Sequence, residues 1–334
     1  MKNKQKLTTT VFIATYRRPR DLERCLRALE RQSRLPDQVI LVVRNDDDET
    51  HALLKAWRFE LPIQVLGVSV PGLIAARNVC LDALDTDLVS MIDDDSAPHP
   101  DWLERIERHF LDDVRLGGLG GRSRLATKPE WDTVCRPVVG KICYFGHLIG
   151  NHHCGFGPAR DVDTLIGVNM SFRSKAIAGL RFDTRLRGRG AQPNEDIAFC
   201  LAVRRQGWRL IYDPQVMVDH YEGTREEPRH YAAMLPVTDA KAFGDVTYNW
   251  VVAIYEEFSP LRHVVYMLWQ SLVGTRLRPG LVQAIRFTPK LGGASWQRFR
   301  ITQTAMLEAY RDLIGKAHRR SPADRNNSNS ELGH

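Results

Sequence analysis

Apolar runs alternate with amphipathic segments along the first third of the chain. The runs have the length and β-branched content of strands that are covered on both faces, and the segments between them carry apolar residues at helical spacing. The predicted strands lie at 11–14, 39–43, 63–68 and 88–92. The predicted helices lie at 22–29, 53–57, 72–84 and 102–110. This strand–helix repeat predicts an α/β fold with a mostly parallel sheet and right-handed crossovers.

The pattern changes after the first third. Residues 117–163 are rich in glycine and irregular, so the pattern assigns them no regular elements. Later predicted elements are a strand at 164–172, a helix after 194–196, short strands at 209–212 and 216–220, and helices over 229–315. We therefore expect an α/β domain at 1–225, a helical basic region at 226–320 and a disordered tail at 321–334.

Polar residues follow three of the predicted strands. They form clusters at 15–18, 45–48 and 93–95, each directly after an apolar run. The carboxyl ends of parallel strands share one edge of a sheet, and ligands bind beyond that edge. The three clusters therefore predict a single site.

The third cluster consists of Asp93, Asp94 and Asp95. Three carboxylates this close repel one another and raise one another's pKa unless a cation offsets them. Carboxylate oxygens suit Mg²⁺ or Mn²⁺, which complete their coordination with water and substrate phosphates. The alternative is a solvated acidic turn before the helix at 102–110.

Charge is unevenly distributed. The formal net charge is +7, but residues 261–320 hold eleven Lys/Arg and only two acids. Such a segment suggests an anionic partner: a membrane surface, a phosphate-bearing substrate or nucleic acid. Its apolar stretch at 264–275 is shorter than the ~20 residues that span a bilayer. One helical face there carries Leu261, Val264, Val265, Leu268, Leu272 and Val273. That face could pack on the catalytic domain or lie on a membrane.

Cysteines and the N-terminus bear on the compartment. The N-terminal ten residues are polar with no signal-peptide core, which predicts a cytoplasmic chain with reduced cysteines, peripheral at the inner face of the membrane if the basic region binds lipid. One group of cysteines and histidines could suggest zinc: Cys135, Cys143 and Cys154 with His147, His152 and His153. Their spacing matches no familiar zinc pattern, which favours a loop with free thiols.

Seven ordered motifs resemble those of the inverting nucleotide-diphospho-sugar glycosyltransferase family 2. The resemblance covers about residues 8–225 and implies the GT-A fold, a Rossmann-like sheet flanked by helices, here with a helical C-terminal extension. In chain order the motifs are VFIATYRRP, VILVVRNDDDET, PGLIAARNVCLDA, LVSMIDDDSAPHPDWL, GVNMSFR, NEDIAFCLAVRRQGW and IYDPQVMVDH.

The resemblance implies roles for individual residues. Asp93 and Asp95 correspond to the outer members of the family's DxD metal motif, and His220 to a histidine that completes the metal site in some members. The donor-binding residues implied are Thr15, Tyr16, Arg17, Arg77, Asn78 and Asp94. Arg44 stands where many members have a base-binding aspartate, which leaves Asp46 or Asp48 as alternatives. Asn169 is implied to orient the acceptor or the base.

Glu195 and Asp196 form the other important pair. By resemblance Asp196 is the general base that takes a proton from the acceptor hydroxyl, on the side opposite the leaving diphosphate. A metal then stabilises that diphosphate, and one in-line displacement inverts the anomeric centre. The structural alternative is two acids that favour the first turn of a helix.

The function expected is therefore sugar transfer from a nucleotide-diphospho-sugar to a saccharide or lipid-linked saccharide acceptor, with Mg²⁺ or Mn²⁺ as cofactor. Two other functions stay open: a nucleotidyltransferase, and a non-catalytic carbohydrate- or nucleic-acid-binding protein. The first usually has a glycine-rich phosphate loop, and residues 8–20 contain none. The second leaves Asp196 and the three aspartates without a purpose, so no nucleic-acid partner is expected.

Overall fold

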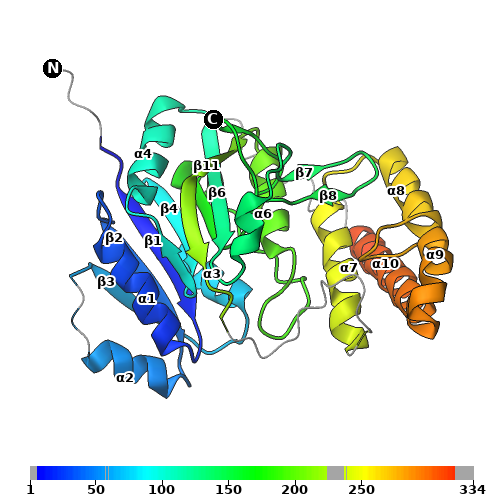
Figure 1. Cartoon of the computed structure of the whole chain (residues 1–334), viewed down its shortest axis with the longest axis horizontal. Helices are drawn as coiled ribbons and strands as arrows, with labels where there is room; N and C mark the ends of the chain where they lie inside the picture. Colours follow the sequence, from blue (N-terminus) through cyan, green and yellow to red (C-terminus); the bar gives the residue numbers. More distant parts are fainter. Residues whose placement is uncertain (1–5, 57, 59, 224–236, 238, 320–334) are drawn as a thin grey trace. The chain divides into compact units, whose positions relative to one another are not determined.

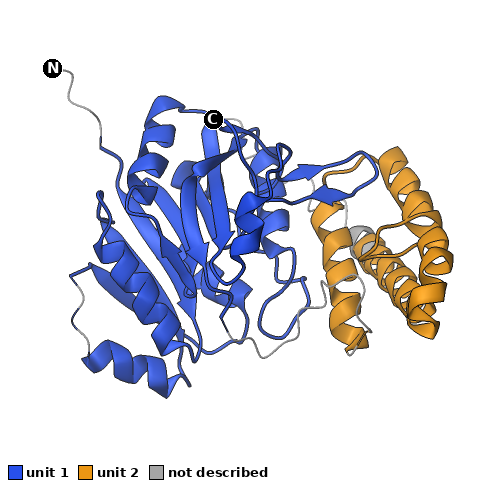
Figure 2. Ribbon diagram, in the orientation of Figure 1, with its two compact units in different colours: residues 1–228 blue, residues 229–334 orange. Residues whose placement is uncertain are grey.

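The computed structural model describes residues 6–56, 58, 60–223, 237 and 239–319. The chain forms two compact units, residues 1–228 and residues 229–334 (Figure 2). The predicted boundary between residues 225 and 226 lies outside the described residues, as does the predicted tail at 321–334.

The first unit is built on a mixed, mostly parallel sheet (Figure 1). The strands of its main path run in the order β3, β2, β1, β4, β10, β6, β11, β5, and β9 pairs with β11. Their bounds are β1 Thr9–Thr15, β2 Gln38–Arg44, β3 Ile63–Val68, β4 Leu88–Asp93, β5 Ser96–Pro98, β6 Leu116–Leu125, β9 Arg160–Asp161, β10 Asn169–Arg173 and β11 Arg209–His220. The α/β fold and the four N-terminal strands expected from the sequence are confirmed.

Helices cover the sheet because their apolar stripes face it. In α1, for example, Leu22, Cys25, Leu26 and Leu29 are buried at helical spacing. The helices of this unit are α1 Pro19–Glu30, α2 Asp48–Ala56, α3 Leu73–Asp82, α4 Trp102–Asp112, α5 Ser174–Ile177 and α6 Glu195–Arg205, with a 3-10 turn at Pro129–Thr133. A separate hairpin pairs β7 Lys141–Ile142 with β8 Leu148–Ile149.

Strand β6 lies at the centre of the sheet, although its glycine-rich sequence predicted no strand. It needs glycine because its neighbours approach too closely for side chains. A Cβ on Gly117 would lie 2.4 Å from Trp208 Cβ, and one on Gly118 would lie 2.6 Å from Leu210 Cδ2. The glycine run that lowers strand propensity is therefore what lets this strand fit.

The two short strands predicted at 209–212 and 216–220 are one strand, β11, with an irregularity between Asp213 and Val218. At this point the Val216 carbonyl projects towards β6, where a Cβ on Gly121 would lie only 1.6 Å from its oxygen. The Asn169 side chain donates to that same carbonyl at 2.9 Å. Beyond the bulge the register resumes, with His220 opposite Leu125. The bulge thus sets where the end of β11 lies.

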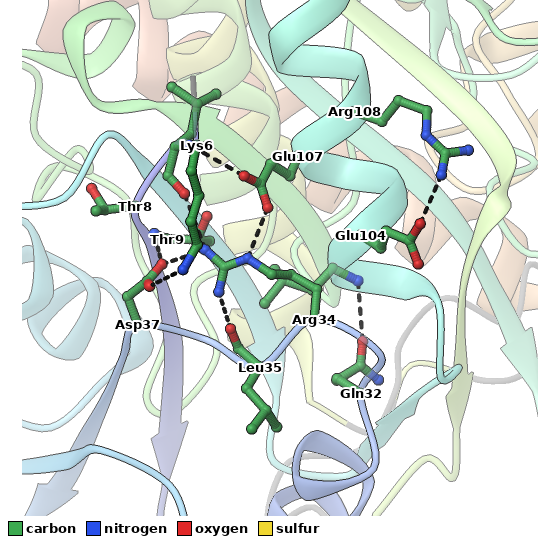
Figure 3. A network of polar contacts seen from close by, with 12 residues as sticks. Lys6, Thr8, Thr9, Gln32, Arg34, Leu35, Asp37, Glu104, Glu107 and Arg108 are labelled. Carbon is green, nitrogen blue, oxygen red and sulfur yellow. Dashed lines mark hydrogen bonds and ion pairs between the residues drawn. The ribbon is translucent and has the colours of Figure 1, made fainter. Parts of the chain in front are cut away.

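A polar network holds the loop after α1 against α4 (Figure 3). Arg34 donates through Nε to Glu107 at 2.8 Å and through Nη2 to the Leu7 carbonyl at 3.0 Å. Gln32 accepts from the backbone N–H of Leu103 at 3.1 Å. These bonds connect the segment before β1, the α1–β2 loop and α4 at the edge of the sheet opposite the carboxyl ends of β1 and β4.

The second unit is helical, as the sequence predicted for residues 229–315. Its helices are α7 Ala240–Ile254, α8 Pro260–Leu272, α9 Leu281–Leu291 and α10 Gly293–Arg319. Helices α7 and α8 are capped by Asp239 and Ser259, which accept from Ala242 N–H and Arg262 N–H. None of the described helices combines the length and the hydropathy required to traverse a bilayer.

The close approach at Gly121 yields a stability prediction. Gly121→Ala should lower the free energy of unfolding by about 3 kcal/mol, because backbone atoms must move to admit the methyl group. Gly150→Ala is the matched control, since a Cβ there would meet nothing within 4 Å. Urea denaturation of both variants measures the difference. Equal stabilities would contradict this account of the bulge.

Candidate active site

Three carboxylates crowd at the end of β4, as the apolar run before them predicted. Asp93 ends the strand and is partly exposed, whereas Asp94 and Asp95 are 0% and 1% exposed. Arg18, just before α1, bridges the two buried groups: Nη2 lies 3.1 Å from Asp94 Oδ1 and Nη1 lies 3.2 Å from Asp95 Oδ2. The guanidinium offsets part of the charge that burial would otherwise make unfavourable.

Hydrogen bonds to Oδ2 fix the orientation of the Asp95 carboxylate. Oδ2 accepts from Gly223 N–H at 2.8 Å as well as from Arg18, so Oδ1 faces His220. His220 Nε2 lies 3.2 Å from Oδ1, yet neither atom has a hydrogen-bond partner with good geometry, and both are buried. Ligand atoms of Asp93, Asp95 and His220 lie within 4.8 Å of one another. Two buried, unsatisfied ligand atoms that point at the same space fit a shared cation.

The electrostatics of the two buried aspartates differ. Burial raises the pKa of Asp94 to about 7, against the opposing effect of Arg18. Burial also acts on Asp95, but His220, Arg18 and the Gly223 N–H outweigh it and hold its pKa well below the usual range. Asp95 is therefore the permanently ionised member of the pair.

The loop after β1 faces the loop after β2. Arg17 donates its backbone N–H to Asp47 at 2.5 Å, and Thr15 is buried at the strand end. Arg44 and Arg17 both lie over the Tyr16 ring, at 4.7 Å and 5.0 Å from its centroid. The two loops therefore bring one aromatic ring and two guanidinium groups together.

Neither predicted alternative to Arg44 lies buried in this loop. Asp46 is exposed and pairs with Arg44 through both oxygens, at 2.9 Å and 2.7 Å. Asp48 is exposed at the first position of α2. Asp47 between them is fully buried and caps α2, accepting from Thr50 N–H at 3.1 Å. Asp47 thus orders the loop, and Asp46 sets the position of Arg44.

Glu195 and Asp196 begin α6, where the helix dipole favours acids. Asn194 precedes them with φ 68°, a left-handed conformation that asparagine tolerates. Asp196 is partly exposed, and its Oδ2 accepts from Gly167 N–H at 2.9 Å. Glu195 is buried and pairs with Arg77. Solvent can therefore reach the Asp196 carboxylate, whereas the Glu195 carboxylate is buried in the protein.

Strand register connects this pair to the aspartates. In the antiparallel pairing of β10 with β4, Asn169 lies opposite Ile92. Gly167 lies in the turn just before β10, where Asn169 N–H donates to the Ile166 carbonyl at 3.0 Å, and the Gly167 N–H holds Asp196. The charge of Asp93 also contributes to the raised pKa of Glu195. The pairing of β4 with β10 thus brings residues about 100 apart in the sequence to one edge of the sheet.

Three other predicted site residues have their polar groups engaged inside the protein. Arg77 is 1% exposed, pairs with Glu195 and donates to the Gly167 carbonyl at 3.2 Å. Asn78 exchanges hydrogen bonds with the backbone of Phe182, at 2.8 Å and 3.1 Å. Asn169 is 1% exposed; its amide group donates to the Val216 carbonyl, and its Oδ1 accepts from Trp102 Nε1 at 3.0 Å. The polar groups of these three side chains are therefore bonded to other parts of the protein.

Residues absent from the predicted set also shape the site. Arg18 belongs to the polar cluster at 15–18 but received no role, and its position next to Arg17 was the available signal. Asp47 could have been recognised as a helix cap, because aspartate is a preferred residue at the position just before a helix. Gly223 acts through its backbone N–H, which no residue-type pattern can identify.

The Cys/His region does not form a metal site among the described residues. Among the described residues, the His, Cys, Asp and Glu side chains that lie close enough together to hold a metal are Asp93, Asp95 and His220. His152 is buried, with Nε2 3.0 Å from the Thr164 carbonyl oxygen. Cys135, Cys143 and Cys154 form no disulfide bond within the described residues.

Burial raises the pKa of Glu195 to about 8, although Arg77 opposes the shift. Its ordinary value is 4.5, so the folded protein binds this proton more tightly than the unfolded chain. The contribution of Glu195 to stability therefore falls as the pH rises from 4.5 through 8. Relative to Glu195→Gln, wild type should lose about 1 kcal/mol or more over this range.

Urea denaturation at several pH values measures this difference. Glu49→Gln, an exposed position in α2, is the control and should follow wild type at every pH. Parallel profiles for wild type and Glu195→Gln would contradict the raised pKa.

Sequence comparisons agree with this geometry. Residues 10–142 match the family model described as Glycosyl transferase family 2. The succinoglycan biosynthesis protein ExoM of Rhizobium meliloti is 33% identical over 225 residues, covering 62% of this chain and 65% of that protein. The glucosyl-dolichyl phosphate glucuronosyltransferase of Haloferax volcanii is 30% identical over 142 residues, covering 40% of this chain and 42% of that protein. The matches span less than two thirds of the length of each relative.

Solved structures share the fold at low sequence identity. The mannosyltransferase PcManGT from Pyrobaculum calidifontis, solved with GDP-Man and Mn²⁺, has a TM-score of 0.53 and 15% identity, covering 98% of this chain and 81% of that chain. TarS 1–349 of S. aureus, solved with UDP-GlcNAc, has a TM-score of 0.52 and 16% identity, covering 92% of both chains. The family model, the sequence relatives and the shared architecture agree: residues 10–142 of this chain match glycosyl transferase family 2, and the chain has the GT-A fold.

Proposed function

We propose that this protein is an inverting glycosyltransferase that moves a sugar from a nucleotide-diphospho-sugar to an acceptor hydroxyl. The observation that carries the proposal is the group of Asp93, Asp95 and His220 at the ends of β4 and β11, in which Asp95 and His220 are buried and Asp93 is partly exposed. The family match supports it, as do similar structures that hold nucleotide-sugars.

Asp93, Asp95 and His220 would hold the divalent cation. Two carboxylates suit Mg²⁺ and Mn²⁺ equally, but the imidazole nitrogen favours Mn²⁺, because Mg²⁺ prefers oxygen ligands. Asp95 is prepared for this role, since Arg18 and Gly223 fix one oxygen and leave the other towards His220. When bound, the cation would stabilise the negative charge that develops on the departing diphosphate.

Residues of the neighbouring loops would bind the donor. Tyr16, with Arg17 and Arg44 over its ring, offers a surface on which a nucleobase can stack. Thr15, at the end of β1, and Asp94, directly after β4, would contact the ribose. Asp46 or Asp48 would add a base contact. Arg18 is close enough to the carboxylates to pair with a diphosphate oxygen as well.

Asp196 would act as the general base. Gly167 N–H holds one of its oxygens, which orients the carboxylate, and partial exposure allows an acceptor to approach it. It would take the proton of the acceptor hydroxyl as that oxygen forms its bond to the anomeric carbon and the diphosphate leaves. The buried pair of Glu195 and Arg77 would hold the first turn of α6 in place.

The acceptor proposed is a saccharide or a lipid-linked saccharide, in the synthesis of a cell-surface polysaccharide or glycolipid. Support comes from the names of two relatives, one a succinoglycan biosynthesis protein and the other acting on a glucosyl-dolichyl phosphate.

Donor binding gives the first test of the site. Asp95→Asn should weaken Mn²⁺-dependent binding of the nucleotide-sugar by about 100-fold, because it removes a metal ligand. Calorimetric titration with UDP- and GDP-sugars, with Mn²⁺ and with chelator, measures this. Asp85→Asn, at an exposed position outside the site, is the control. If the affinity for the nucleotide-sugar changes neither with Mn²⁺ nor with the substitution, the metal assignment is wrong.

Transfer gives the second test. Asp196→Asn should lower the rate of sugar transfer or donor hydrolysis by about 100-fold or more, because the base is lost. Its affinity for the donor with Mn²⁺ should stay within about twofold of wild type, because Asp196 is assigned no donor contact. Product release measured by chromatography, beside the same calorimetric titration, separates the two effects. An unchanged rate would remove Asp196 from the mechanism.

A further inference from the structure

Helix α8 in the second unit presents an apolar face to its surroundings. Leu261, Val264, Leu268 and Leu272 recur at helical spacing and are 71%, 52%, 58% and 55% exposed. A helix at a protein surface ordinarily turns its polar side outward. Here the inward side carries Gln270, which is 1% exposed and donates to the Arg278 carbonyl at 2.6 Å. The inward side also carries Tyr266, which is 1% exposed, so α8 has apolar side chains on both sides and exposes more apolar surface than an ordinary surface helix.

Helix α9 continues this feature. Leu281, Val282 and Ile285 are 38%, 52% and 56% exposed. Arg286 and Lys290, four residues apart, are exposed directly beside them on the same helix. A tight turn joins the two helices, closed by Gly280 N–H and the Val273 carbonyl at 3.2 Å, and Figure 1 shows α8 and α9 next to each other. We name the seven apolar residues of α8 and α9 the apolar face.

Between Glu257, just before α8, and Glu308 in α10, the Asp, Glu, Lys and Arg positions are all occupied by Lys or Arg. Residues 258–307 contain no Asp or Glu but seven Lys/Arg. Within the part of the chain that the structure describes, Arg276, Arg286, Lys290 and Arg300 are exposed and form no ion pair. Cations without nearby acids produce a local positive potential, which attracts an anionic surface.

An exposed apolar stripe bordered by cations matches the requirements of a lipid interface. The apolar side chains can enter the boundary between headgroups and acyl chains, while the basic side chains stay among anionic headgroups. Another copy of this chain would bring the same positive charge to the contact, which opposes pairing through this face. Charge complementarity therefore favours a membrane over a second copy.

We infer that the apolar face of α8 and α9 binds the surface of a bilayer that contains anionic lipid. The inference does not depend on the proposed sugar transfer, because binding to lipid requires none of the residues at the end of β4. If both hold, the enzyme would be retained where a lipid-linked acceptor is found.

Vesicle co-sedimentation of the full chain tests the inference. Wild type should sediment with vesicles of phosphatidylcholine and phosphatidylglycerol, and less with phosphatidylcholine alone. The triple variant Leu261→Ser, Leu268→Ser, Ile285→Ser should bind the anionic vesicles at least about tenfold more weakly, because three apolar side chains no longer leave water.

A matched control comes from α10 in the same unit. Leu307 and Ile314 are exposed to a similar extent, 58% and 47%, but lie on a different helix. Leu307→Ser with Ile314→Ser should bind vesicles as wild type does. Circular dichroism and thermal unfolding of both variants should match wild type, because all the substituted side chains are exposed. A loss of binding equal to that of the triple variant would show that exposed apolar area in general, not this face, binds lipid.

The charges have a test of their own. Arg286→Gln with Lys290→Gln should weaken binding to anionic vesicles and leave the small residual binding to phosphatidylcholine unchanged. Sedimentation equilibrium of wild type and the triple variant completes the set. If wild type fails to bind vesicles, the membrane inference is overturned. If wild type also forms a dimer that the triple variant does not form, the apolar face joins two copies of the chain.

Discussion

The mutual repulsion of Asp93, Asp94 and Asp95 is the constraint around which the first unit is arranged. Two of the three carboxylates are buried, so the protein must bring positive charge or a cation to them. Arg18 supplies part of this charge from the start of α1, and His220 approaches from the end of β11. The positions of α1 and β11 are therefore coupled to the electrostatics at the end of β4, and a bound cation would strengthen the same coupling.

Placing His220 there requires the close packing of β6 against β11. Side chains on β6 would push its neighbours apart, so glycines occupy the points of closest approach, and the Val216 carbonyl fills the space at Gly121. Asn169 fixes that carbonyl from β10, whose register also carries Gly167 and thus Asp196. The strands around β10 therefore support both the candidate metal ligands and the candidate base, although these residues belong to distant segments.

The two units differ in the kind of side chain that needs a partner: buried carboxylates in the first unit and exposed apolar side chains in the second. The first buries charge and must offset it with specific partners, which makes its polar residues interdependent. The second leaves apolar side chains exposed on α8 and α9 and surrounds them with cations, an arrangement that gains stability only from an external apolar and anionic phase. A single chain thereby combines a precisely organised polar site with a surface that has no specific polar partner.

The sequence by itself determined the strand–helix repeat, the carboxyl-end edge of the sheet and the three aspartates on it, because periodicity and strand-end polarity are local properties. It also carried the motifs that identify the family. Only tertiary structure decided that β6 is an interior strand of the sheet, because its glycines are required by the close approach of residues far along the chain. The inward roles of Arg77 and Asn169 and the bridging role of Arg18 were decided in the same way, since they depend on which groups long-range packing brings within hydrogen-bonding distance.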